Sequence, residues 1–312
     1  MIRKAIAVVT VLALLLALNT LWVDSQTRAA AARSGGRIIA TQVVPANVKV
    51  EGSGPAIVMI HGFGAAIDWW DDIAPALAAD HRVIRIDLIG HGGTEAPRSG
   101  YSIERQAQLV ASVLDSLGVK RVTVIGHSMG GEVAAALAVM NPNRIERLVL
   151  IDSPPAVGTK FSPLAQAYFT RGIGELLHHF SSDGVVRHGL QQGFAPGFPV
   201  PDKFVADFRQ LTYDAAREAH DDSEAYRAAQ PTNERLAALK PVPPLLVVFG
   251  TEDAIVPPEH AKLFNKVPGA KIVMIPGAGH SPMVETPEKV LEAIRNFERP
   301  EASTNMPEKP YP

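Results

Sequence analysis

Chemistry in this chain is most strongly indicated at the segment GHSMG, residues 126–130, which separates the run RVTVI from the small-residue segment GEVAAALAVM. A serine must sit on a sharp strand-to-helix turn to project its hydroxyl above a sheet. Glycines two residues before and two residues after it leave room for the crossing backbones. A helix that starts here directs its backbone amides and positive dipole end at developing negative charge. The spacing therefore predicts that Ser128 is a nucleophile.

A nucleophilic serine needs a base, because an unassisted hydroxyl is a weak nucleophile. The chain has ten histidines, and His280 lies in the Gly-rich segment PGAGHSP after the apolar run KIVMI, where a strand end can present it to other loops. We therefore predict that His280 is the general base. Other roles are expected for the remaining candidates: loop hydrogen bonds for His61 and His91, orientation away from the serine for His127, a helix position for His260, and substrate contacts for His178, His179 and His188.

The base in turn needs an acid that fixes its tautomer and stabilises the imidazolium. Asp253 follows the run LLVVFG by a few residues and so lies at a strand end, which predicts that it is this acid. Asp152 directly follows the run RLVLI and remains an alternative acid at another strand end. Glu252 is expected to point away from the site, and Asp87 is expected to brace its own turn.

These residues require a sheet that brings distant strand ends together. Short apolar runs have the near-continuous Val, Ile and Leu content of parallel strands that are buried on both faces, at residues 56–60, 82–86, 121–125, 147–151, 245–249 and 271–275. Helical patterns alternate with these runs at residues 69–79, 103–117, 131–140 and 259–266. The alternation predicts an α/β fold with a doubly wound, mostly parallel sheet. Residues 37–50 are expected to add one or two antiparallel edge strands.

The alternation stops after residue 151, and strands resume only at residue 245. The helical patterns between them, at residues 164–180 and 201–226, predict a lid over the carboxyl ends of the strands, where ligands bind in open α/β sheets. A helical layer without a functional role is the alternative. The polar stretch AHDDSEAY, residues 219–226, is interpreted as a solvated face of the lid and not as a metal site.

From about residue 40 to residue 297 the chain resembles the α/β-hydrolase superfamily, in particular its lidded esterases, meta-cleavage-product hydrolases and cofactor-free haloperoxidase-like enzymes. The likeness is carried by HGFG (61–64), DLIGHG (87–92), GHSMGG (126–131), and GTED (250–253) with GH (279–280). The resemblance implies the chain order serine, acid, histidine, which Ser128, Asp253 and His280 follow. It also implies an oxyanion hole formed by the backbone amides of Phe63 and Met129, with no metal and no other cofactor.

This resemblance implies a serine hydrolase that cleaves a carboxylic ester, or a related acyl bond, of a small molecule through an acyl-enzyme. Carbon–carbon bond hydrolysis, lactone hydrolysis and perhydrolase chemistry remain alternatives on the same triad, because the lid sets specificity. A substrate carboxylate would need a lid cation, for which Arg171, Arg187 and Arg209 are the candidates. Epoxide hydrolysis and dehalogenation are disfavoured, since similar enzymes of those classes have an aspartate at the position of Ser128. A binding protein that keeps the fold without the chemistry is the alternative from another class.

The composition excludes other classes of protein. Lys+Arg 30 and Asp+Glu 32 nearly cancel, so the chain lacks the strongly basic balance that is typical of nucleic-acid binding. The absence of cysteine excludes disulfides, thiolate chemistry and a Cys-based zinc site.

The N-terminus carries a targeting pattern, because Arg3 and Lys4 precede an uncharged run from Ala5 to Val23. A helix over this run is about 28 Å long, close to the thickness of the hydrocarbon core of a bilayer. The run predicts a membrane anchor with the remaining chain outside the cytoplasm, and a cleaved signal peptide, secreted or periplasmic, is the alternative. The expected organisation is a signal-anchor or signal peptide (1–23), a linker (24–37), a hydrolase core in two parts (38–153 and 232–298), a helical lid (154–231) and a disordered tail (299–312).

Overall fold

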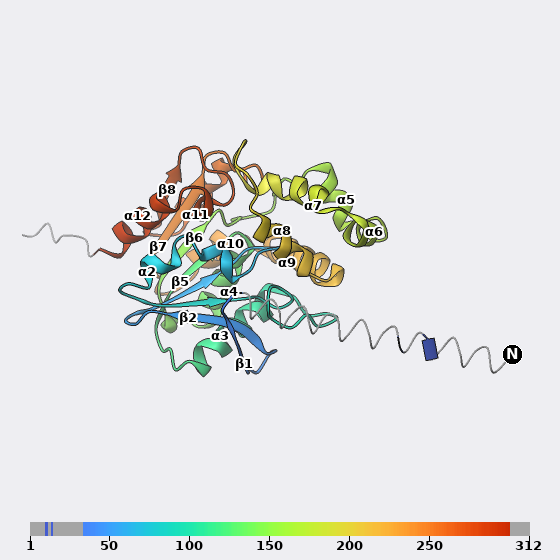
Figure 1. Cartoon of the computed structure of the whole chain (residues 1–312). Coiled ribbons are helices and arrows are strands. Elements are labelled where there is room, and N and C mark those ends of the chain that lie inside the picture. The colour runs from blue at the N-terminus through green and yellow to red at the C-terminus, as the bar shows by residue number, and fades with distance from the viewer. Residues whose placement is uncertain (1–9, 12–13, 15–33, 300–312) are drawn as a thin grey trace, which may run out of the picture.

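The strands form one eight-stranded sheet in the computed structural model of the protein, which describes residues 10–11, 14 and 34–299 (Figure 1). The strand order is β1-β2-β4-β3-β5-β6-β7-β8. β2 is antiparallel to both of its neighbours, and β3 to β8 are parallel to one another. The predicted mostly parallel sheet with an antiparallel edge is therefore confirmed. The bounds are β1 Arg37–Ile39, β2 Ala46–Glu51, β3 Ala56–Ile60, β4 Arg82–Ile86, β5 Val122–His127, β6 Ile145–Ile151, β7 Leu245–Gly250 and β8 Lys271–Ile275.

Helices cover both faces of the sheet, as the alternating pattern predicts. α3 (Ile103–Ser116) and α4 (Met129–Met140) pack in one apolar cluster, and α12 (Pro287–Glu298) packs in the other. The Ser102 hydroxyl caps α3 by accepting the amide of Arg105. The shorter helices of the core are η1 Ile67–Trp70, α2 Ala74–Leu77, η2 Pro142–Arg144, α10 Thr232–Ala237, η4 Pro258–Lys266 and α11 Pro282–Glu285.

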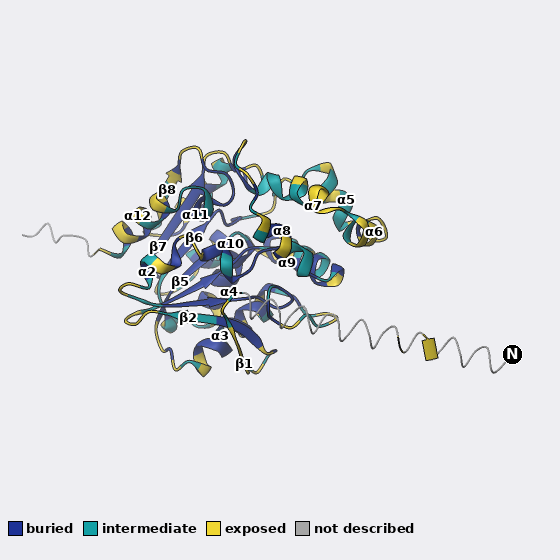
Figure 2. Ribbon diagram, in the orientation of Figure 1, coloured by how far each residue is buried: buried dark blue, intermediate teal, exposed yellow. Residues whose placement is uncertain are grey.

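Burial on both faces explains the continuous apolar runs of the central strands. Every residue of β5 and of β7 is buried (Figure 2). Successive side chains of β7 point to opposite faces: Val247 and Phe249 belong to the cluster that contains α3 and α4, whereas Leu246 and Val248 belong to the cluster that contains α12. The sheet is thus a rigid platform for the loops at its carboxyl edge.

Two of the predicted core helices differ from the structure. Residues 69–79, predicted as one helix, contain the end of η1 and the separate helix α2. Pro75 explains the division, because a proline lacks an amide donor and is accommodated in the first turn of a helix. The predicted helix at residues 259–266 is the 3₁₀ helix η4, which has Pro258 in its first turn.

The helices of the predicted lid lie between β6 and β7, to the right of the sheet in Figure 1. Both long helical patterns predicted here are divided in the structure. Gly172, with φ +79°, precedes α6 and separates it from α5. Thr212 caps α9 by accepting the amide of Ala215, which separates α9 from α8. The bounds are α5 Pro163–Phe169, α6 Ile173–Phe180, α7 Asp183–Leu190, η3 Gln191–Gly193, α8 Asp202–Gln210 and α9 Tyr213–Ala229.

The predicted N-terminal apolar helix, residues 5–23, lies almost entirely outside the described residues, as do most of the predicted linker and residues 300–312 of the predicted tail. Within the described ranges, no helix combines the length and the apolar character that crossing a membrane requires. The membrane anchor therefore stays a prediction from the sequence.

Candidate active site

Ser128 occupies a tight turn between β5 and α4. Its φ of +50° lies in the left-handed region, which a non-glycine residue adopts only where the surrounding structure enforces it. Its amide donates to the carbonyl oxygen of Ile151 on β6 at 2.9 Å. A Cβ on Gly126 would collide with the carbonyl oxygen of Gly130, and a Cβ on Gly130 would collide with that of Ile60. The two glycines therefore allow the backbones to cross next to the serine.

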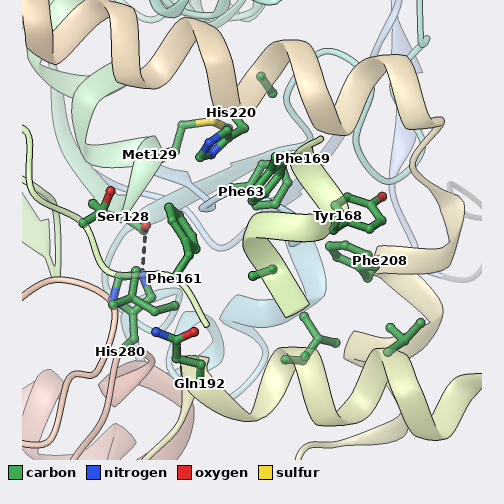
Figure 3. A pocket seen from close by; sticks show the side chains of 18 of the residues that line it. Phe63, Ser128, Met129, Phe161, Tyr168, Phe169, Gln192, Phe208, His220 and His280 are labelled. Carbon is green, nitrogen blue, oxygen red and sulfur yellow. Dashed lines mark hydrogen bonds between the residues drawn. The ribbon is translucent and has the colours of Figure 1, made fainter. Parts of the chain in front are cut away.

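Three loops bring a hydroxyl, an imidazole and a carboxylate into one hydrogen-bonded chain. His280 Nε2 lies 2.9 Å from Ser128 Oγ (Figure 3), and His280 Nδ1 lies 2.8 Å from Asp253 Oδ2. The loops follow β5, β7 and β8, which are parallel strands of the same sheet. His280 and Asp253 are buried, whereas Ser128 is half-buried and faces a cavity. The geometry therefore permits proton transfer from Ser128 to His280.

The surroundings of Asp253 keep this residue ionised. Its Oδ1 accepts hydrogen bonds from the amides of Ile255 (2.8 Å) and Val256 (2.9 Å). Burial by itself would raise the pKa of Asp253. The charge and the hydrogen bond of His280, together with the two amides, outweigh burial and lower the pKa below its ordinary value. An anion bonded to Nδ1 leaves Nε2 available to accept the serine proton.

Asp152, the alternative acid, lies beside this chain at the end of β6. It is fully buried, its φ is +43°, and its Oδ1 accepts the amide of Gly250 at 2.9 Å. Burial, followed by the charge of Asp253, raises its pKa well above the ordinary value. One atom each of Asp152, Asp253 and His280 lie within 4.8 Å of one another, which is close enough to share a metal ion. His280 Nδ1, however, is already bonded to Asp253, so Asp253 and not Asp152 contacts the ring.

The two residues predicted for the oxyanion hole border the nucleophile. Phe63, in the loop after β3, and Met129, the first residue of α4, line the same cavity as Ser128. The HGFG loop lies close to the serine, since a Cβ on Gly62 would be 3.0 Å from Ser128 Cβ. His61 holds this loop by donating from Nδ1 to the carbonyl oxygen of Gly62 at 2.8 Å, in the role expected for it.

Two contacts that sequence reasoning did not identify hold the His280 loop in place. The Nε2 of His127 donates to the carbonyl oxygen of His280 at 2.7 Å, and the ring of His127 lines the cavity together with Ser128. Glu285 accepts the amides on either side of His280 at 3.0 and 3.1 Å, and the amide of Ala195 in the lid at 2.8 Å. No local pattern marks Glu285, because its contact with the lid joins residues that are distant in the sequence.

A cavity of about 190 Å³ lies between the core and the lid, with Ser128 in its wall. Its lining is mainly apolar and rich in aromatic rings, which Figure 3 shows around the space beyond the serine: Phe63, Phe161, Tyr168, Phe169 and Phe208. Pockets with such a lining bind apolar groups, and a few polar groups fix their orientation.

One lid histidine of the three predicted to contact substrate lines the cavity. His178 accepts or donates a hydrogen bond with the Tyr168 hydroxyl at 2.9 Å, and burial lowers its pKa to about 4. A neutral ring at ordinary pH follows from this pKa. His179 and His188 are exposed and lie outside the cavity lining.

The three lid arginines that are the candidates to bind a substrate carboxylate are either paired with a carboxylate or lie outside the cavity lining. Arg209 lines the cavity, but its Nε donates to Asp183 at 3.0 Å. Arg187 pairs with Asp202 at 2.5 Å, and Arg171 is exposed and lies outside the cavity lining. None of these three arginines therefore both lines the cavity and is free of a carboxylate partner.

The polar stretch at residues 219–226 is not the solvated face that the sequence predicts, because one side of α9 is buried. His220 lines the cavity and stacks on a phenylalanine of α5, with ring centroids 3.7 Å apart. Ser223 donates to Glu132 of α4 at 2.8 Å, and Glu132 also pairs with Arg227 on the next turn of α9. The buried positions recur every three to four residues, which is the spacing of one helix face.

Known proteins share this fold. The family model described as alpha/beta hydrolase fold matches residues 55–287. A 2-hydroxymuconate semialdehyde hydrolase of Pseudomonas putida is 29% identical, over 84% of this chain and 93% of its own length. An uncharacterised protein of Mycobacterium tuberculosis is 28% identical, over 80% of this chain and 76% of its own length. The structure of a thermophilic esterase from Thermogutta terrifontis superposes with a TM-score of 0.69 at 27% identity, over 84% of this chain and 97% of that chain.

Proposed function

The chain belongs to the alpha/beta hydrolase family, and we propose that it is a serine hydrolase that cleaves a carboxylic ester through an acyl-enzyme intermediate. The observation that carries the proposal is the hydrogen-bonded chain from Ser128 Oγ through His280 to Asp253, at 2.9 and 2.8 Å. A hydroxyl in such a chain is activated as a nucleophile. The likeness to a solved esterase supports the same reaction class.

In this mechanism, Ser128 Oγ attacks the ester carbonyl carbon while His280 Nε2 takes the hydroxyl proton. Asp253 stabilises the imidazolium through Nδ1, and the amides of Phe63 and Met129 hold the oxyanion. When the tetrahedral intermediate collapses, His280 returns its proton to the leaving alcohol and the acyl group remains on Ser128. Water then attacks the acyl-enzyme with His280 as base, which releases the carboxylic acid and restores the serine.

The charges around the cavity favour an uncharged, apolar acyl group over a carboxylate-bearing one. Arg209 and Arg227 are the Arg or Lys residues of the cavity lining, and both are paired with carboxylates. A substrate carboxylate buried there would have no free Arg or Lys partner among the lining residues, and an unpaired buried charge costs several kcal/mol. Ester cleavage is therefore preferred to carbon–carbon hydrolysis of a muconate-type substrate, which the curated relative from Pseudomonas putida suggests as the second candidate.

Labelling of the full chain with a fluorophosphonate probe tests the nucleophile. We expect the unmodified protein to be labelled and Ser128→Ala to remain unlabelled, because the probe reacts with an activated serine. Ser53→Ala, at an exposed serine on the loop after β2, is the control and should be labelled normally. Absence of labelling in both the unmodified protein and the control would contradict the proposal and favour a binding protein.

A panel of p-nitrophenyl esters of rising acyl length tests the reaction. We expect turnover of esters with apolar acyl groups and a loss of about 10⁶-fold in kcat in Ser128→Ala. Negligible turnover across the panel, with turnover of a lactone or a vinylogous diketone instead, would replace ester cleavage by one of the alternatives on the same triad.

We further propose that residues 1–23 attach the enzyme to a membrane with its catalytic part outside the cytoplasm. The support is the uncharged apolar run after two basic residues. The lid offers a second apolar feature, since Ile173, Leu176 and Phe180 of α6 are 54%, 61% and 82% exposed. In a carbonate wash the full chain should stay with the membranes, and a variant without residues 1–23 should be released. A full-length chain of unchanged mass in the supernatant would contradict the anchor.

A further inference from the structure

A second carboxyl group lies beside the proposed triad acid and has no part in the mechanism above. Asp152 directly follows β6, and Asp253 follows the adjacent strand β7. Asp152 is fully buried, and its Oδ1 accepts the amide of Gly250 at 2.9 Å. Its Oδ2 is also buried but has no hydrogen-bond partner at ordinary distance. Nearly all buried polar atoms in native proteins are paired, so this oxygen requires an explanation.

The backbone holds Asp152 firmly in this position. Its amide donates to the carbonyl oxygen of Val248 on β7 at 2.8 Å, so both its main chain and its side chain are bonded to β7 or to its end. Its φ of +43° is in the left-handed region, which is strained in a residue other than glycine. Strain of this kind persists where the surrounding structure enforces it, and it concentrates at functional sites. The surrounding structure therefore holds the carboxyl group of Asp152 in this position.

Two carboxylates in one buried site cannot both be ionised, because water does not screen their repulsion. The titratable groups around Asp152 are Asp253 after β7, and His280 and Glu285 in the segment after β8. Asp253 is the carboxyl that keeps its charge, since His280 and two backbone amides stabilise its anion. Asp152 has one amide donor, and burial followed by the charge of Asp253 raises its pKa well above the ordinary value.

We propose that Asp152 is a positioning residue of the triad, whose carboxyl group stays protonated at neutral pH and directs its proton to the carboxylate of Asp253. The unpaired Oδ2 then becomes a donor, and the site holds one negative charge in place of two. A hydrogen bond from Asp152 delocalises the charge of Asp253 and fixes the Asp253 carboxylate against His280. It also limits how strongly Asp253 favours the imidazolium form of His280. The role rests on the proposed serine-hydrolase function.

The pH profile of kcat/KM for a p-nitrophenyl ester tests the proposal. Asp152→Asn keeps a neutral donor, so we expect kcat/KM within about twofold of the unmodified enzyme and an unmoved acid limb. Asp152→Ala removes the donor. We then expect kcat/KM to fall by about tenfold, because a hydrogen bond to a charged group is worth at least that factor. The acid limb should move to higher pH, since an unshared Asp253 charge favours the imidazolium more strongly.

If Asp152 is ionised instead, the acid limb of kcat/KM is expected to shift in the opposite direction. Both replacements would then remove a negative charge near His280, and the acid limb would move to lower pH in each variant. That shift would overturn the proposal. Glu252→Gln is the matched control, because it removes an exposed carboxylate next to Asp253 in the sequence and should leave kcat/KM and the acid limb unchanged.

Infrared difference spectroscopy separates this proposal from the proposed function, because it needs no turnover. At pH 8 the unmodified chain should show the carbonyl band of a protonated carboxylic acid that Asp152→Asn lacks. Absence of this band at pH 8 overturns the proposal whatever the activity of the enzyme. Its presence in a protein that neither binds fluorophosphonate nor cleaves esters would support the protonated Asp152 and reject the serine-hydrolase function.

Discussion

Asp253 and Asp152 lie in the loops that follow adjacent strands and are both buried, yet their hydrogen bonds differ. Asp253 receives two backbone amides and the ring of His280, whereas Asp152 receives one amide. Hydrogen bonds to an anion lower the pKa of a carboxyl group, and burial raises it. The pKa values of Asp253 and Asp152 are therefore shifted in opposite directions. The choice between two acids of the same type is therefore made by a few donors within hydrogen-bonding distance.

Replacement of the acid that touches the imidazole should have a large effect on turnover. We expect Asp253→Asn to lower kcat by about 10⁴-fold, because an amide at this place favours the wrong tautomer of His280. KM should change little, since Asp253 is not among the residues that line the cavity. Steady-state kinetics with a p-nitrophenyl ester measures both constants. A loss of less than tenfold would show that Asp152 takes over as the acid.

Asp87, the residue expected to brace its own turn, should make stability depend on pH. It accepts hydrogen bonds from the amides of Ile67 and Gly93 and from Asn47 Nδ2, at 2.7, 2.8 and 2.7 Å. Burial outweighs these bonds and raises its pKa to about 6. A carboxyl group whose pKa is higher in the folded state contributes stability that is present below the unfolded pKa, near 4, and is lost as the pH rises through the folded pKa.

We therefore expect Asp87 to lower the free energy of unfolding by up to about 3 kcal/mol between pH 4 and pH 7. Urea unfolding at these two pH values should show that the free energy of unfolding falls less in Asp87→Asn than in the unmodified protein. The difference between the two pH values is the readout, since the variant also weakens hydrogen bonds at every pH. Equal falls in both proteins would contradict the prediction.

Between elements, a buried ion pair ties the lid to the helix that follows the nucleophile. Arg227 of α9 pairs with Glu132 of α4, and both side chains are almost fully buried. Ser223 donates to the same carboxylate at 2.8 Å. Since α4 begins at Met129, this contact connects the lid helix α9 to the turn that presents Ser128.

Arg227→Met should destabilise the fold by about 3–5 kcal/mol, because it leaves the Glu132 carboxylate buried without a counter-charge. The double variant Glu132→Leu with Arg227→Met should recover most of this loss, since removing both charges also removes the cost of desolvating them. Chemical denaturation of the three proteins measures the effect. A double variant as unstable as Arg227→Met would mean that packing around the arginine, and not its charge, holds the two helices together.

For the whole molecule, the closure of the lid over the sheet defines the space that a substrate can fill. Phe63 from the core and Phe169 from the lid meet edge to face, with ring centroids 5.7 Å apart, and His220 of α9 stacks on the ring of Phe169. The cavity wall is thus shared between two parts of the chain that are separated in the sequence.

Phe169→Ala should therefore change the preference for acyl length. Removing the ring enlarges the cavity, and we expect the ratio of kcat/KM for a long-chain ester to that for the acetate ester to rise by about tenfold. Phe180→Ala is the control, because that ring is 82% exposed on α6 and lies outside the cavity lining. An unchanged ratio in Phe169→Ala, or an equal change in both variants, would contradict a cavity that selects by length.

The strands, the sharp turn at Ser128 and the loops that carry His280 and Asp253 were all predictable from the amino-acid sequence. These features depend on local patterns: continuous apolar runs for strands covered on both faces, and glycines at fixed spacing where backbones cross. Because parallel strands end at a common edge, these motifs predicted that the serine, the histidine and a carboxylate lie together. The N-terminal anchor stays a prediction from the same kind of pattern.

The tertiary structure alone decided which polar residues are buried and how they are paired. It divided the lid helices, buried one side of residues 219–226 against Glu132, and placed Glu285 between the His280 loop and the lid. It also set Asp152 beside Asp253, with only one of the two bonded to the ring. The physical reason is that the partners of a buried polar group come from distant parts of the chain, so no local pattern contains them.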